Sequence, residues 1–159
     1  MPVSGSNRQS GRGADAAGNG TPVSAKMVFT INSDHDATLG VQQQILDRVE
    51  NAGFAGRELF GIKLALLEAI ANAINHGNKK DPAKHVHIEA RISPKKIELL
   101  VEDEGPGFDR RGVPDPTADE NLEKCSGRGI LLIESYMGRV WWDRGGRRLR
   151  MVKEHIDSR

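Results

Sequence analysis

The feature that most constrains this chain is a pair of polar residues in an apolar helical segment, within the run from Glu68 to Asn78. Glu68 and Asn72 are four residues apart, and an α-helix turns once in about 3.6 residues, so both side chains lie on one face. Burying an unpaired amide or a lone carboxylate is unfavourable by several kcal/mol. The pair therefore indicates a site, where a divalent ion with phosphates would satisfy both groups, unless it lies on a solvated helix edge.

The composition predicts one domain behind a disordered tail. The chain has 159 residues, and residues 1–26 are rich in Gly, Ser, Asn and Pro without any apolar period, so the folded part is expected over 27–159. No apolar run approaches the roughly 18 residues of a membrane span. A net charge of +1 does not favour binding to nucleic acid or membranes. Cys125 is the only cysteine, which excludes an internal disulfide and fits a cytoplasmic protein.

Apolar periodicity predicts strands and helices in a distinctive order. The predicted strands are 27–31, 86–92, 97–101, 140–142 and 149–152. The predicted helices are one that is capped by Asp36 or Thr38 and ends at Gly53, one over 57–76, and a short one over 129–137. Because two helices are paired and the strands are grouped, this order predicts an α+β fold with helices on one face of a mixed, mainly antiparallel sheet.

The helix predicted over 57–76 has an apolar stripe that we expect to face the core. The stripe consists of Phe60, Leu64, Leu67, Ala71 and Ile74. Gly77 follows, and we expect it to end the helix in the left-handed conformation. Glu68 and Asn72 lie one residue round from this stripe, which is why a solvated edge remains an alternative for them.

A second carboxylate lies at the end of the strand predicted over 97–101. Asp103 shares the parity of Ile97, Leu99 and Val101, so it is expected to face the core at the mouth of a pocket. An inward acceptor there suits an exocyclic amine such as that of adenine. Gly105 and Gly107 follow and allow close approach of the backbone to a ligand. Taken alone, this Gly-x-Gly pattern is also typical of an ordinary turn.

The third segment is Gly127-Arg128-Gly129, which comes directly before the predicted helix 129–137. A helix N-terminus offers free N–H groups and partial positive charge, which suit a phosphate. The preceding stretch, 104–128, is longer than loops usually are in a compact domain, and such loops are often lids.

Other strand residues have less specific meanings. His85 and His87 share one strand face, and without a third ligand we favour a solvated face over a metal site. Trp141 and Trp142 alternate between faces, so we expect one in the core and the other exposed.

Together the three segments resemble the ATP-binding domain shared by DNA gyrase, histidine kinases and anti-sigma-factor serine kinases, known as the Bergerat or GHKL fold. The run Glu68 to Asn78 matches its N box, Asp103 to Gly107 its first glycine box, and Gly127 to Gly129 its second. The resemblance covers about residues 27–155. Its implied architecture is a two-layer α/β sandwich. The compact form, with His76-Gly77 after the Glu/Asn pair, is most similar to the anti-sigma serine kinases.

The resemblance implies a role for each matching position. Glu68 is implied as the catalytic base, Asn72 as the ligand of Mg²⁺, and Asp103 as the acceptor for the adenine amine. The other residues that it places at the nucleotide are Asn75, His76, Gly105, Gly107, Gly127, Arg128 and Gly129. The second box has fewer glycines than that of histidine kinases. Roles for individual basic residues of the lid stay open, namely Arg110, Arg111, Lys124 and Arg128.

By the same resemblance, the chain is expected to be a cytoplasmic, homodimeric serine/threonine protein kinase that uses ATP and Mg²⁺. Such proteins bind a sigma factor and phosphorylate a small STAS-type antagonist of the anti-sigma factor. The alternative is an ATP- or ADP-binding switch without phosphoryl transfer. The presence of Glu68 weighs against it, because a pure binder needs no base. A catalytic fragment of a histidine kinase fits least, because no His lies in a dimerising helical pair.

Overall fold

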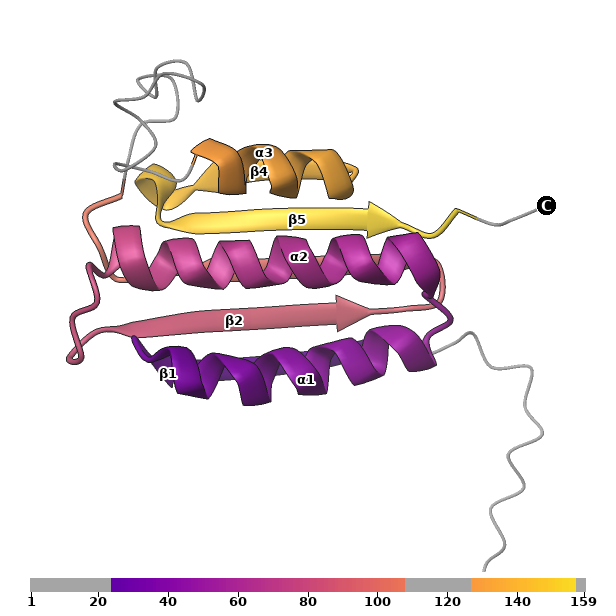
Figure 1. Cartoon of the computed structure of the whole chain (residues 1–159), viewed down its shortest axis with the longest axis horizontal. Coiled ribbons are helices and arrows are strands. Elements are labelled where there is room, and N and C mark those ends of the chain that lie inside the picture. The colour runs from indigo at the N-terminus through magenta and orange to yellow at the C-terminus, as the bar shows by residue number, and fades with distance from the viewer. Residues whose placement is uncertain (1–23, 108–126, 157–159) are drawn as a thin grey trace, which may run out of the picture.

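The computed structural model describes residues 24–107 and 127–156, and it forms one sheet of five strands with helices on one face (Figure 1). The strands are β1 (Ala25–Asn32), β2 (His85–Ile92), β3 (Lys96–Glu102), β4 (Arg139–Asp143) and β5 (Arg148–Glu154). They lie in the order β1-β2-β3-β5-β4. Every pairing is antiparallel, so the predicted α+β fold is confirmed and its sheet is wholly rather than mainly antiparallel.

The helices are α1 (His35–Asn51), α2 (Gly56–Asn72) and α3 (Gly127–Tyr136). The N-cap of α1 is Asp34, whose Oδ1 accepts from the N–H of Asp36 at 2.9 Å, and not Asp36 or Thr38 as predicted. Gly53 follows the end of α1 with φ of 105°, which agrees with its predicted role. The first strand, β1, begins at Ala25, two residues before residue 27, where the folded part was predicted to start. Residues 1–23 of the predicted tail lie outside the described residues.

The core lies between the helices and one face of the sheet. Alternate residues of β2 are buried, as the sequence pattern predicts: Val86, Ile88, Ala90 and Ile92. The side of α2 that packs on the sheet contributes Ile62, Ala65, Leu66, Ala69 and Ile70, all at most 2% exposed. Burial of this apolar surface is the main source of stability for a domain of this size.

The apolar stripe predicted for α2 is only partly on the buried side of the helix: Ile74 is fully buried, as expected, but other members are not. Phe60 is 54% exposed and Leu67 is 36% exposed, whereas their neighbours Ile62 and Leu66 are fully buried. Both sides of α2 carry apolar residues, so periodicity alone does not choose between them. The small side chains on the buried side allow a close approach of helix and sheet, and this packing decides which side faces inward.

The end of α2 also differs from the prediction. The helix continues into a single π-helical turn, η1 (Ala73–Gly77), closed by a 2.8 Å hydrogen bond from the Asn78 N–H to the carbonyl of Ala73. Gly77 is not in the left-handed region, so it is not the terminator we expected. The chain turns instead at Lys79 and Lys80, with φ of 52° and 58°. Single π turns inside helices often occur at functional sites.

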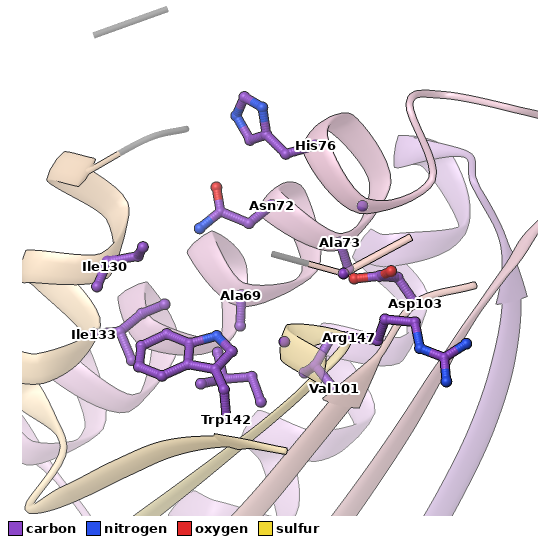
Figure 2. Close-up of a pocket in the computed structure, with 14 residues that line it drawn as sticks. Ala69, Asn72, Ala73, His76, Val101, Asp103, Ile130, Ile133, Trp142 and Arg147 are labelled. Atoms are coloured by element: carbon purple, nitrogen blue, oxygen red, sulfur yellow. The ribbon is translucent and has the colours of Figure 1, made fainter. Parts of the chain in front are cut away.

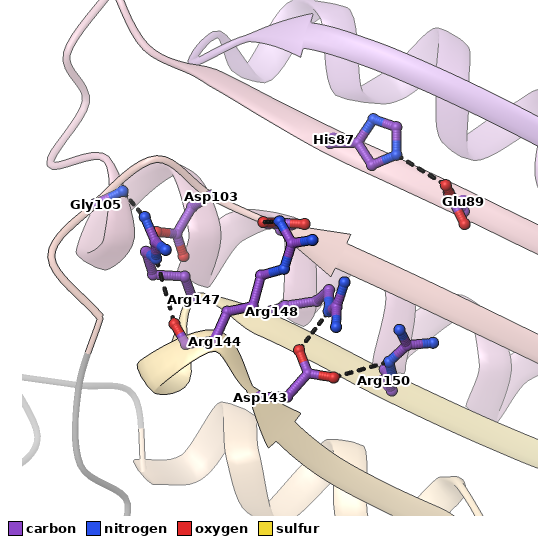
Figure 3. A network of polar contacts seen from close by, with 10 residues as sticks. His87, Glu89, Asp103, Gly105, Asp143, Arg144, Arg147, Arg148 and Arg150 are labelled. Carbon is purple, nitrogen blue, oxygen red and sulfur yellow. Dashed lines mark hydrogen bonds and ion pairs between the residues drawn. The ribbon is translucent and has the colours of Figure 1, made fainter.

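The run Asp143-Arg-Gly-Gly146 between the last two predicted strands is a hairpin signal, and β4 and β5 do form a hairpin across it, with β4 at the edge of the sheet. Its turn has positive φ at Arg144, Gly145 and Gly146. At its base the carboxylate of Asp143 accepts hydrogen bonds from the guanidinium groups of Arg148 and Arg150 (Figure 3). These two cations, above all Arg148, lower the pKa of Asp143.

Trp141 is 41% exposed and Trp142 packs against the core, in line with the expected alternation. Within the described residues, no helix has the length and apolar character that crossing a membrane requires.

Candidate functional site

A cavity of about 180 Å³ lies between the end of α2, the turn η1, the helix α3, the end of β3 and the hairpin β4–β5 (Figure 2). Its apolar lining consists of Ala69, Ala73, Val101, Ile130, Ile133, Trp142 and Leu149. Its polar side chains are Asn72, His76, Asp103 and Arg147. Apolar walls with a few convergent polar groups are typical of a small-molecule site. The cavity therefore brings together the predicted N box and first glycine box.

One wall comes from the end of α2. Asn72 and His76 point toward the cavity from successive turns (Figure 2). Glu68 lies one turn before Asn72 and is half-buried, but it does not line the cavity. Its carboxylate forms no hydrogen bond or ion pair with any residue in the described part of the chain. The pair of residues is thus split between the cavity and the adjoining helix surface.

Asn75, which we expect at the nucleotide, is not among the residues that line this cavity. Its Oδ1 is 3.1 Å from Nε2 of His35 at the start of α1. A π turn winds less per residue than an α turn, because its hydrogen bonds span five residues rather than four. The wider turn leaves His76 on the cavity side and directs Asn75 toward α1.

The opposite wall holds Asp103, just after β3. Its Oδ1 accepts from the Gly105 N–H at 2.8 Å, and its own N–H donates to the carbonyl of Arg147 at 3.0 Å. Burial raises the pKa of Asp103, although the Gly105 N–H and the positive charge of Arg147 oppose this shift. No group among the described residues bonds to Oδ2. This carboxylate is therefore held in place with one oxygen available as an acceptor.

Glycines make this geometry possible. A Cβ at Gly77 would lie 2.3 Å from Cγ and Oδ2 of Asp103, and a Cβ at Gly105 would lie 1.9 Å from the carbonyl oxygen of Gly77. Gly107, with φ of 79°, approaches the carbonyl of Gly145 in the hairpin turn in the same way. The missing side chains of Gly105 and Gly107 thus make room for other protein segments rather than for a ligand, and Gly107 also lines the cavity. Gly77 likewise acts through its lack of a side chain rather than as a helix terminator.

The second glycine box forms the first residues of α3, and does not precede the helix as predicted. The helix α3 begins at Gly127, and Gly129 is buried close to the cavity residue Ile130. The predicted lid lies mostly outside the described residues, together with Arg110, Arg111, Lys124 and Cys125. The side chain of Arg128 also lies outside them.

The histidines of β2 lie beside carboxylates. His87 pairs with Glu89 at 3.0 Å, and His85 lies 3.8 Å from Glu104. The side chains of His85 and His87 are 46% and 37% exposed, so this face of the strand is in contact with solvent. In residues 24–107 and 127–156, no three His, Cys, Asp or Glu side chains are grouped so that they can hold a metal ion.

Three residues of the site were missed by sequence reasoning. One of the two tryptophans was expected in the core, but Trp142 was not expected at the site, and it forms part of the cavity floor. Arg147 carried no local signal at all. Asn78 was treated as a loop residue but is fully buried. A polar residue directly after His-Gly in the N box was the available signal for Asn78, because a buried amide needs several partners.

The residues present fit an adenine nucleotide. Apolar walls suit the base, and Asp103 supplies an acceptor among them. The volume is below the roughly 300–1,000 Å³ of most ligand sites, so the described walls enclose a base-sized part of a ligand. For Mg²⁺ the described chain offers the amide oxygen of Asn72. This fits an ion that takes its other ligands from phosphates and water, as Mg²⁺ commonly does.

Comparison with known proteins agrees with this geometry. An anti-sigma F factor of Clostridium perfringens is 36% identical over 111 residues, which cover 59% of this chain and 79% of that protein. A serine-protein kinase RsbW of Oceanobacillus iheyensis is 32% identical over 109 residues, covering 64% and 69%. An anti-sigma F factor of Shouchella clausii is 38% identical over 82 residues, covering 50% of this chain. The match spans little more than half of that protein's length, at 56%.

A solved structure has the same fold. The RsbU and RsbW domains of a Mycobacterium tuberculosis protein superpose with a TM-score of 0.57, covering 82% of this chain and 32% of that one. The sequence identity is 17%, so this likeness concerns the fold alone. The family model of the histidine kinase-like ATPase domain matches residues 31–153, well over half of the sequence. The chain therefore belongs to the family of histidine kinase-like ATPase domains.

Proposed function

We propose that this protein is an ATP-dependent serine/threonine protein kinase that acts as an anti-sigma factor. The observation that carries the proposal is the placement of Asn72 and Asp103 on facing walls of one cavity, with Glu68 one helical turn away. Relatives named anti-sigma F factor and serine-protein kinase RsbW support it. The partners would be a sigma factor and a STAS-type antagonist, and we propose a homodimer in the cytoplasm.

The cavity would bind the adenine ring through its own side chains. Ala69, Val101 and Trp142 would exclude water from the ring, and Oδ2 of Asp103 would accept from the exocyclic amine. Asn72 would present its amide oxygen to Mg²⁺ on the phosphate side, with His76 beside it. The N–H groups at the start of α3, near Gly129, would donate to phosphate oxygens. Mg²⁺ supplies neutralisation of phosphate charge when bound.

Glu68 would accept the proton of the acceptor serine. Its carboxylate is half-buried and has no bonding partner among the described residues, so it is available to a substrate hydroxyl. General-base help of this kind is commonly worth about 10²–10⁴-fold in rate. Phosphoryl transfer needs positioning and charge stabilisation more than covalent chemistry, so an otherwise small catalytic set is sufficient.

One observation favours the second candidate, a nucleotide-binding switch. Glu68 does not line the cavity, so nucleotide binding alone would not require it. Both candidates predict ATP binding, but only the kinase predicts transfer of a phosphoryl group from ATP to a serine of a partner protein.

The test uses the full chain with Mg²⁺, γ-labelled ATP and STAS-type antagonist proteins that carry an acceptor serine. We expect label on that serine for the wild type. Glu68→Gln, which keeps size and polarity but removes the base, is expected to lower the rate at least about 100-fold with ATP affinity unchanged. Replacing the acceptor serine by alanine is the control for site specificity. If the wild type binds ATP and labels none of these proteins, the switch is the better description.

A further inference from the structure

Asn78 is a fully buried amide that uses both ends of its side chain. Its Nδ2 donates to Oγ of Ser33 and to the carbonyl of His85, both at 2.9 Å. Its Oδ1 accepts from the backbone N–H of Glu104 at 2.8 Å. One side chain thus joins three segments: the loop after β1, the start of β2 and the segment that leaves β3.

The bond to Glu104 lies at the end of the cavity where Asp103 stands. Gly77 precedes Asn78, and Glu104 lies between Asp103 and Gly105. On both sides of this bond the two segments are in close contact, because Cβ atoms at Gly77 and Gly105 would overlap with the facing segment. The Asn78 amide is therefore the polar link between the end of η1 and the segment that carries the Asp103 carboxylate.

Glu104 also forms a second hydrogen bond, through its side chain, but this bond does not substitute for the one between its backbone N–H and Asn78. Its side-chain Oε2 accepts from the N–H of His85 at 3.0 Å, and that side chain is exposed. An exposed hydrogen bond contributes less than a buried one, because water competes for both partners. The buried bond from Asn78 fixes the backbone itself, one residue from Asp103.

We propose that Asn78 is a positioning residue for nucleobase recognition, acting through the Glu104 backbone to hold Asp103 against Gly77. This inference rests on the proposed binding of ATP by the cavity. A well-placed carboxylate distinguishes the 6-amino group of adenine from the 6-oxo group of hypoxanthine, because the latter offers a second acceptor. Loss of the link would leave Asp103 held only by its bonds to Gly105 and Arg147, and the looser placement would reduce this discrimination.

The test measures dissociation constants of ATP and ITP by calorimetry, each with Mg²⁺. We expect the wild type to prefer ATP by about tenfold or more, which corresponds to one charge-assisted hydrogen bond. Asn78→Ala is expected to lower this ratio to about threefold or less, mainly by weaker ATP binding. A merely structural role would weaken both nucleotides alike and leave the ratio unchanged.

Two variants separate the link from general stability. Ser33→Ala removes one partner of Nδ2 and leaves the bond to Glu104, so the ratio is expected to stay at the wild-type value. Asn78→Asp keeps an acceptor oxygen for the Glu104 N–H but loses both donated bonds, so it should be less stable with the ratio retained. Should Asn78→Ala fail to fold, Asn78→Ser replaces it. Serine keeps a polar group at this buried position, but its side chain is one bond shorter than that of asparagine and is not expected to reach the Glu104 N–H.

The outcomes are distinct. A wild type that binds neither nucleotide contradicts the proposed function. A wild type that prefers ATP, with a folded Asn78→Ala or Asn78→Ser variant that keeps the full preference, contradicts only the role of Asn78. Equal loss of preference in Ser33→Ala and Asn78→Ala would also overturn it, because the bond to Glu104 would then not be the cause.

Discussion

At the scale of single residues, the absence of a side chain at Gly77 is as important as any side chain in the cavity. Gly77→Ala would place a Cβ 2.3 Å from the Asp103 carboxylate, which would have to leave its position. We expect about tenfold weaker ATP binding, measured by calorimetry, because the acceptor for the amine is displaced. Gly40→Ala in α1 is the matched control, since a Cβ there meets nothing within 4 Å. It should keep ATP affinity and raise stability by about 0.5–1 kcal/mol.

Titration of the Asp103 carboxylate should contribute to the pH dependence of the free energy of unfolding. Burial raises its pKa above the ordinary value of 3.8, so the folded protein binds more protons there than the unfolded chain does. The free energy of unfolding that this group contributes therefore falls as pH rises from the ordinary value through the raised one. Asp103→Asn should be more stable than the wild type at pH 7, by a margin that shrinks toward pH 4. Urea unfolding across this range measures the margin, and a margin that grows on acidification would contradict the assignment.

At the scale of elements, α2 provides a direct test of which side faces the core. Leu66 is fully buried and its neighbour Leu67 is 36% exposed. Leu66→Ala should cost about 2–5 kcal/mol, because it leaves a cavity in the core. Leu67→Ala should cost less than about 1 kcal/mol, as is usual at surface positions. Urea unfolding of the two variants measures both values, and equal losses would mean that α2 is rotated from the orientation described.

The elements also show what the sequence can and cannot predict. The three helices, the five strands and the hairpin were predicted because their apolar periods and turn residues are local. Asp103 was predicted to face inward from strand parity alone, and it lines the cavity. The side of α2 that packs on the sheet was not correctly predicted. Both sides of this helix are apolar, and only contact with the sheet decides which of them is buried. The contact of Asn75 with His35 was not predicted for a similar reason, since no local sequence pattern indicates a π turn.

At the scale of the whole molecule, a bound nucleotide should stabilise the fold. A ligand that binds only the folded state adds about 2.7 kcal/mol at one hundred times its Kd, so ATP with Mg²⁺ should raise the Tm by several degrees. Chelation of Mg²⁺ by EDTA should remove most of this shift. Asn72→Ala should show a small shift with or without EDTA, because its amide oxygen is the proposed metal ligand. Differential scanning calorimetry measures the shifts, and an EDTA-sensitive shift of full size in Asn72→Ala would contradict the role of Asn72.

The strand order of the sheet has a consequence for when this protein becomes able to bind. The last of the described strands, β5, lies inside the sheet between β3 and β4 rather than at an edge. It carries Leu149 of the cavity floor, and the turn before it carries Arg147. During synthesis from the N-terminus, the cavity therefore stays incomplete until the final residues of the sheet have been made and inserted. Nucleotide binding by this chain would therefore require that β5 has been made and has inserted into the sheet, and a product truncated before β5 is expected not to bind ATP.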